Sequence, residues 1–124
     1  MTDLERALND GLAPWKEIEH RTRQFWIFRD GYPVTAGHLL FVPTYSNSEC
    51  LEACFRAAYK WGYDGVELER WDGFNIGQNV GAAAGQTVMY PHVHMIPRRT
   101  GDCGDPRGGV RHVIPNKGNY LNEK

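Results

Sequence analysis

The stretch Gly85-Gln86-Thr87-Val88-Met89-Tyr90-Pro91-His92-Val93-His94-Met95-Ile96-Pro97-Arg98 carries the strongest signal in this sequence. Its apolar and β-branched residues around two histidines are typical of a strand, in which successive side chains point to opposite faces. We therefore expect Tyr90, His92 and His94 on one face. Pro91, Val93 and Met95 are then expected on the other face, so the two imidazoles are aimed at one target.

A loop of small residues, Asn79-Val80-Gly81-Ala82-Ala83-Ala84-Gly85-Gln86-Thr87, precedes this strand. Such a loop exposes backbone N–H groups with little side-chain bulk, so an anion can approach it closely. The amides of residues 85–87 and the hydroxyl of Thr87 are expected to stabilise added negative charge. The loop therefore favours a phosphate ligand.

A neutral imidazole is a competent nucleophile near neutral pH. Attack at phosphorus would form a covalent phosphohistidine that water later cleaves, which splits one difficult displacement into two easier steps. A second histidine two residues away on the same face can reach the same phosphate. His92 and His94 on an ordinary solvent-facing strand would be the alternative, and the adjoining loop makes that alternative the weaker one.

Length and charge restrict the class of protein. The 124 residues predict one domain, 1–124, and the formal net charge of −1 disfavours broad contact with nucleic acid or with a membrane surface. The N-terminus lacks the features of a signal peptide, which predicts a cytoplasmic protein. Cys50, Cys54 and Cys103 form no even-numbered framework, and the first two are expected in the core as small apolar residues.

The first half of the chain predicts a short helix over Asp3–Leu8 that packs weakly, and then strands. Trp15–Glu19 and Gln24–Arg29 form the expected strand pair, with Trp26-Ile27-Phe28 as its apolar centre. A turn at Asp30-Gly31-Tyr32-Pro33-Val34 leads into a strand over Gly37–Pro43.

The second half predicts a helix that Ser46 or Ser48 caps, that covers the sheet, and that Gly62 ends after Trp61. Val66–Trp71 is expected as a strand, and another begins at Phe74 after the turn Asp72-Gly73. A polar, glycine-rich loop follows Arg98, which is more often functional or mobile than idle.

Three features together resemble the histidine triad (HIT) family of nucleotide hydrolases and transferases. They are the run from Gly85-Gln86-Thr87-Val88 to Ile96-Pro97-Arg98, the Gly37-His38 strand that ends at Pro43, and the interval from Asp30 to His38. One position departs from the family pattern His-x-His-x-His, because Tyr90 replaces the first histidine. The resemblance implies an α+β fold with an antiparallel sheet of about five strands, one main covering helix and a short N-terminal helix.

The resemblance also implies roles. His92 matches the nucleophile, His94 contacts the transferred phosphate or the leaving group, His38 supports the triad from behind, and Tyr90 holds a supporting position. The resemblance implies that Asp30 contacts the ribose of a nucleotide. Asn79, Gln86 and Thr87 are expected to contact the phosphate, and the residues around the base are expected to be Trp26, Ile27 and Phe28.

The implied reaction is hydrolysis or transfer at the α-phosphate of a nucleoside phosphoramidate or a dinucleoside polyphosphate. The expected partner is a small-molecule purine nucleotide, and the family implies a homodimer. No metal or cofactor is required, although magnesium would accompany a polyphosphate. Two alternatives stay open: a catalytically silent purine-nucleotide-binding module, which the change at Tyr90 makes credible, and a zinc or iron site formed by His38, His92 and His94.

Overall fold

The computed structural model describes residues 1–121. Along the chain lie α1 (Asp3–Asn9), β1 (Ile18–Arg21), β2 (Phe25–Arg29), β3 (Leu39–Pro43), α2 (Ser48–Glu67), β4 (Gly73–Gly77), the 3₁₀ turn η1 (Ala82–Ala84), β5 (Val93–Arg98) and the 3₁₀ turn η2 (Gly109–Val113). The strands form one antiparallel sheet in the order β1-β2-β3-β5-β4. The expected α+β fold is confirmed.

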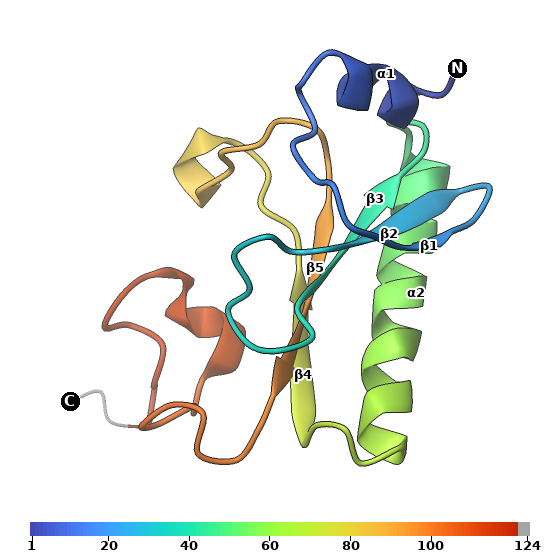
Figure 1. Ribbon diagram of the computed structural model, residues 1–124. Coiled ribbons are helices and arrows are strands. Elements are labelled where there is room, and N and C mark those ends of the chain that lie inside the picture. The colour runs from blue at the N-terminus through green and yellow to red at the C-terminus, as the bar shows by residue number, and fades with distance from the viewer. Residues whose placement is uncertain (122–124) are drawn as a thin grey trace.

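The sheet buries a different apolar cluster on each face. Helix α2 lies along one face (Figure 1), where Cys54 and Ala58 pack with Ile27, Phe41, Leu39, Val93 and Met95. The short α1 covers part of the other face, where Leu4 and Ala7 pack with Phe28, Leu40, Val42 and Ala13. Alternation along β2 and β3 separates the two sets, because neighbouring side chains on a strand point to opposite sides.

Helix α2 is longer than its sequence predicts, because Gly62 and Gly65 lie inside it and do not end it. A Cβ atom at Gly62 would lie 2.4 Å from the ring of Phe74, and one at Gly65 would lie 1.9 Å from the ring of Trp71. The two glycines therefore let both rings approach the helix backbone, and the indole N–H of Trp71 donates to the carbonyl of Gly62 at 2.8 Å. Asn47, not a serine, is the N-cap.

Other boundaries also differ from the sequence-based prediction. Residues 66–71 end α2 and turn back, so no strand lies there. The first strand begins at Ile18, not at Trp15, and β5 begins only at Val93. Helix α1 is well anchored, because Leu4 is fully buried and Thr2 and Glu5 form a capping box.

The predicted alternation is confirmed from His92 to Met95, whereas Pro91 precedes the strand and lies with Tyr90 beside Leu12 and Pro14, so its predicted place on the face of Val93 is wrong. Val93 and Met95 are fully buried on the α2 face, and Tyr90 packs against the α1 cluster on the opposite face. Cys50 and Cys54 are buried and Cys103 is exposed, as free thiols. Burial raises the pKa of the Cys54 thiol to about 12, which leaves it unreactive. Within residues 1–121, no helix has the length and apolarity needed to span a membrane.

Candidate active site

A cavity of about 670 Å³ opens on the sheet face opposite α2. Its lining comes from the segment before β1, the turn after β2, the loop after β4 and the beginning of β5. The sequence-predicted residues that line it are Asp30, Asn79, Gln86, Thr87, His92 and His94. The fold therefore gathers at one place side chains that are up to 64 positions apart in the sequence, as the numbers of Asp30 and His94 show.

His92 presents one free ring nitrogen to this cavity. Its Nδ1 lies 2.8 Å from the backbone carbonyl oxygen of Tyr90, which can only accept, so Nδ1 carries the proton. In the neutral ring the lone pair is then on Nε2. The indole of Trp15 meets the imidazole at its edge, with the ring centroids 4.9 Å apart. Both contacts hold His92 in one orientation.

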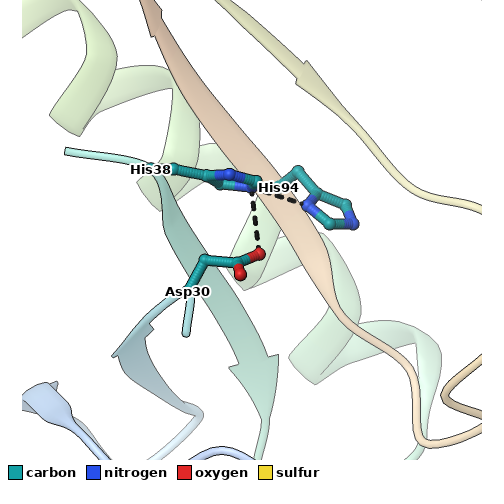
Figure 2. Close-up of side chains that lie close together, drawn as sticks. All are labelled: Asp30, His38 and His94. Atoms are coloured by element: carbon teal, nitrogen blue, oxygen red, sulfur yellow. Dashed lines mark hydrogen bonds and ion pairs between the residues drawn. The ribbon is translucent and has the colours of Figure 1, made fainter. Parts of the chain in front are cut away.

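His38 and His94 form a pair whose proton positions follow from their neighbours. The backbone N–H of Val34 donates to Nδ1 of His38 at 3.1 Å, so the proton of neutral His38 lies on Nε2. That Nε2 is 2.9 Å from Nδ1 of His94, which must therefore accept (Figure 2). The proton of His94 is then on Nε2, the nitrogen that is free to donate to a ligand.

Asp30 stands beside this pair in the turn that follows β2. Its Oδ1 accepts the backbone N–H of Tyr32 at 2.7 Å, and its Oδ2 is 3.4 Å from Nε2 of His38 (Figure 2). The side chain of His38 is only 3% exposed. His38 is thus placed behind the cavity wall, as the sequence predicts for a supporting residue.

The electrostatics keep both members of the pair neutral at pH 7. Burial, together with the nearby His92 and His38, lowers the pKa of His94 to about 4, against an opposing effect of the Asp30 carboxylate. Burial also lowers the pKa of His38, against an opposing effect of the Asp30 carboxylate. A neutral His94 can donate the Nε2 proton in a hydrogen bond without adding a charge to the buried pair.

The loop after β4 offers fewer free amides than its sequence predicts. The N–H groups of Gly85 and Gln86 donate to the carbonyls of Ala82 and Gly81 across η1. Within residues 1–121, the N–H and the hydroxyl of Thr87 make no such bond. Thr87 therefore lines the cavity with an N–H and a hydroxyl that are both available to a phosphate, and Asn79 joins it in the cavity lining.

Gln86 lines the cavity, but its side chain serves the loop itself. Its Oε1 accepts the N–H of Gly81 at 2.8 Å, while its Nε2 donates to the carbonyls of Val88 and Met89 at 3.2 and 3.1 Å. The side chain of Gln86 therefore holds the loop in shape, and its predicted contact with the nucleotide stays a prediction.

The aromatic wall of the cavity differs from the prediction. Ile27 faces α2, Phe28 is only 1% exposed beneath Trp15, and the ring of Trp26 carries the guanidinium of Arg21 at 4.8 Å. None of these three residues lines the cavity, whereas Trp15 and Leu40 do. Sequence reasoning missed Trp15 because its position before β1 shows no periodicity that marks it.

The backbone carbonyl of Tyr90 accepts the hydrogen bond from His92, whereas its side chain points away from the cavity toward the end of β3. Its hydroxyl donates to the carbonyl of Pro43 at 2.7 Å, and the carbonyl of Thr44 is 3.4 Å away. The phenol therefore ties the segment before β5 to the end of β3, and it makes no hydrogen bond to His38. Burial raises the pKa of the Tyr90 hydroxyl, so it stays protonated and keeps donating.

A metal site fits these distances poorly. The donor atoms that lie close together belong to Asp30, His38 and His94, within 4.8 Å of one another, and not to His92. Two imidazoles on a tetrahedral zinc ion would hold their nitrogens about 3.3 Å apart. The 2.9 Å between His38 and His94 is instead a hydrogen-bond distance. Within the described residues, no buried polar side-chain atom lacks a hydrogen-bond partner.

Comparisons with known proteins agree with this geometry. Residues 17–101 match the HIT domain. The chain is 37% identical over 80 residues to an AP-4-A phosphorylase of Mycobacterium tuberculosis, covering 58% of this chain and 41% of that one. A Zn-bound histidine triad family protein from Mycobacterium smegmatis superposes with a TM-score of 0.67 at 30% identity, covering 80% of this chain and 76% of that one.

A diadenosine triphosphate hydrolase from Plasmodium falciparum, solved in complex with Cyclomarin A, superposes with a TM-score of 0.62 at 25% identity, covering 72% of this chain and 65% of that one. The chain spans between 16% and 63% of the length of the curated relatives that it matches. Residues 17–101 include every strand and most of the cavity lining, whereas Pro14, Trp15 and Lys16 lie before the matched region.

The lowered pKa of His94 predicts a loss of stability in acid. Between pH 6.5 and about 4 the unfolded chain binds a proton at this histidine that the folded protein does not. The free energy of unfolding should therefore fall as the pH drops through this window. NMR titration should give His94 a pKa near 4 in the folded protein, and urea unfolding of a His94→Gln variant should depend less on pH. A His94 that titrates near 6.5 would contradict the burial.

Proposed function

The chain belongs to the HIT domain family, and on that premise we propose that it is a nucleotide hydrolase or nucleotidyl transferase. Its substrates are nucleoside phosphoramidates or dinucleoside polyphosphates, and the attack occurs at the α-phosphate. One observation carries the proposal: the free Nε2 of His92 and the Nε2–H of His94 share a cavity, each fixed by a hydrogen bond on the other ring nitrogen.

In the first step Nε2 of His92 attacks phosphorus and forms a P–N bond. The bond from phosphorus to the leaving amine or phosphate breaks, and an amine leaving group takes up a proton from solvent. The imidazole becomes cationic, because Nδ1 keeps its proton and continues to donate to the carbonyl of Tyr90. That hydrogen bond strengthens as the positive charge develops, which stabilises the transition state over the ground state.

In the second step water attacks the same phosphorus, the bond to His92 breaks, and the nucleoside monophosphate leaves. A proton of the water passes to solvent. In transfer, another acceptor takes the place of water. The Nε2–H of His94 donates to a phosphoryl oxygen in both steps, and the N–H and hydroxyl of Thr87 supply further donors. Because these groups are placed before the substrate binds, little reorganisation is needed.

The remaining cavity residues suit the nucleoside. Asp30 can accept hydrogen bonds from the ribose hydroxyls, since Oδ2 has only a long contact of 3.4 Å to His38. The half-buried ring of Trp15 and the side chain of Leu40 form the apolar wall for a purine base. Lys16 also lines the cavity and brings positive charge toward a polyphosphate, whereas Arg29 in the lining is paired with Glu19 at 2.7 Å.

We place Tyr90 at the first position of the triad. The side chain at that position reaches the end of β3 and does not enter the cavity. The nucleophile depends on the backbone carbonyl of residue 90, which any residue supplies. The change from histidine to tyrosine therefore leaves the proposed chemistry intact. This reasoning favours an active enzyme over a silent nucleotide-binding module.

No metal is needed by this route, and magnesium would accompany only a polyphosphate substrate. A metal protein is the weaker alternative, because the histidine nitrogens are at a hydrogen-bond distance. A cytoplasmic location and the absence of nucleic-acid and membrane partners stay predictions from the sequence. Metal analysis of untagged protein, beside turnover in EDTA, separates the enzyme from the metal protein.

The first test is intact-mass spectrometry of the protein mixed with adenosine phosphoramidate or with a diadenosine polyphosphate and quickly quenched. We expect a nucleotidyl adduct and release of AMP, both lost by at least about a thousandfold in His92→Ala because the nucleophile is gone. The matched control is His112→Ala, whose ring contacts the carbonyl of Arg107 outside the cavity. Binding of AMP with neither adduct nor turnover would instead establish the silent module.

A second test separates the hydroxyl of Tyr90 from its backbone. Tyr90→Phe removes the bond to the carbonyl of Pro43, so we expect a loss of about 1 kcal/mol in the free energy of unfolding. Turnover should stay within about threefold, because the carbonyl that holds His92 is unchanged. Chemical unfolding and steady-state kinetics measure the two effects. A Tyr90→His variant that is faster by orders of magnitude would show that the native chain is a weakened enzyme.

We also propose a homodimer through the edge of the sheet at β4. Within residues 1–121 this strand pairs only with β5, so it is an edge of the sheet, and the exposed rings of Tyr59 and Tyr63 lie next to its Phe74. Tyr63→Lys should weaken dimerisation about tenfold or more in sedimentation velocity. Tyr45→Lys, at an exposed ring that follows β3, is the control. A wild-type monomer at high micromolar concentration would refute the dimer.

A further inference from the structure

The carboxylate of Asp30 has contacts that ribose binding does not require. Oδ1 accepts the N–H of Tyr32 at 2.7 Å, which fixes the plane of the carboxyl group. Oδ2 then lies 3.4 Å from Nε2 of His38 (Figure 2). The backbones are joined as well, because the N–H of Asp30 donates to the carbonyl of His38 at 3.1 Å. Asp30 and His38 therefore form one unit, and their side chains are only 16% and 3% exposed.

The Nε2–H of His38 points to Nδ1 of His94, which lies 2.9 Å away. The charged Oδ2 of Asp30 lies 3.4 Å from the same Nε2, which is a charge contact and not a second hydrogen bond. A negative charge beside a nitrogen favours the form in which that nitrogen carries the proton, and both side chains are largely shielded from water. The carboxylate therefore stabilises the form of His38 that carries its proton on Nε2. The N–H of Val34 stabilises the same form from the other side of the ring.

We infer that Asp30 is a positioning residue for the reaction as well as a ribose contact. Its carboxylate keeps the proton of His38 on Nε2, His38 keeps Nδ1 of His94 as an acceptor, and the proton of His94 is thereby held on Nε2, toward the phosphate. Asp30 acts through the two histidines and touches no reacting atom. The inference rests on the function proposed above, since it assigns a purpose to the orientation of His94.

The direct test needs no substrate. In ¹⁵N-labelled wild-type protein, we expect the ring nitrogens of His38 and His94 to report one form, with the proton on Nε2 of both rings. In Asp30→Asn the negative charge is lost, so His94 should become a mixture of the two neutral forms. A wild-type His94 with its proton on Nδ1 would overturn the inference, and so would an Asp30→Asn spectrum in which both rings are unchanged.

The kinetic test removes the ribose contact from the comparison. Adenosine phosphoramidate and its 2′,3′-dideoxy analogue are assayed with wild-type protein and with Asp30→Asn. If Asp30 only bound the ribose hydroxyls, the substitution would not affect turnover of the dideoxy substrate. We expect kcat on that substrate to fall about tenfold with little change in KM, because the negative charge that favours the proton on Nε2 of His38 is lost. Equal kcat values for the two proteins would overturn the inference.

Controls separate this outcome from other failures. Glu52→Gln removes one carboxylate from the exposed side of α2, outside the cavity, and should leave kcat unchanged. Thermal unfolding of Asp30→Asn shows whether the variant is folded, and the wild-type spectrum tests the proton positions without any variant. A wild-type protein that turns over neither substrate would count against the proposed function, whereas the spectra would still decide the role of Asp30.

Discussion

The hydrogen bond between Nε2 of His38 and Nδ1 of His94 is the contact on which the site depends. It joins β5 to the residue just before β3, and it lies at the end of the register that pairs Leu39 with Met95 and Leu40 with His94. The same backbone pairing that builds the sheet therefore brings the two imidazoles together. Burial then keeps both rings neutral, so each has one donor and one acceptor nitrogen.

Side chains along β5 alternate between the hydrophobic core and the cavity. Val93 and Met95 are fully buried under α2, while His94 faces the cavity on the other side. A strand that is anchored by its apolar residues cannot rotate or slip, because a shift of one residue would exchange the two faces. The packing of Val93 and Met95 in the core thus fixes the direction in which His94 points. The backbone of β5 needs no further ordering to place His94 at the cavity.

The irregular segment before β5 contributes in a different way. Residues 85–92 are held by the side chain of Gln86, by the phenol of Tyr90 and by the turn of η1, in place of strand pairing. This anchoring puts the carbonyl of Tyr90 against Nδ1 of His92, and it leaves the groups of Thr87 free. The ring of Trp15, from a segment that is remote in sequence, packs against the ring of His92. The nucleophile is therefore oriented by backbone and packing, and the identity of residue 90 matters little to it.

The amino-acid sequence was enough to predict the fold class, the shared face of His92 and His94, and most of the polar residues around the cavity. These features depend on local periodicity and on a specific motif, and both can be read from neighbouring residues. Three features became known from the folded structure. Helix α2 continues through Gly62 and Gly65, and Trp15 lines the cavity in place of Trp26 and Phe28. The side chain of Gln86 forms hydrogen bonds within its own loop. These features follow from contacts that form only when the chain folds. The indole of Trp15 packs against His92, which is remote in sequence, and the rings of Phe74 and Trp71 turn back onto Gly62 and Gly65 of α2. The partners of Gln86 are close in sequence, but the loop must fold before its side chain can reach Gly81.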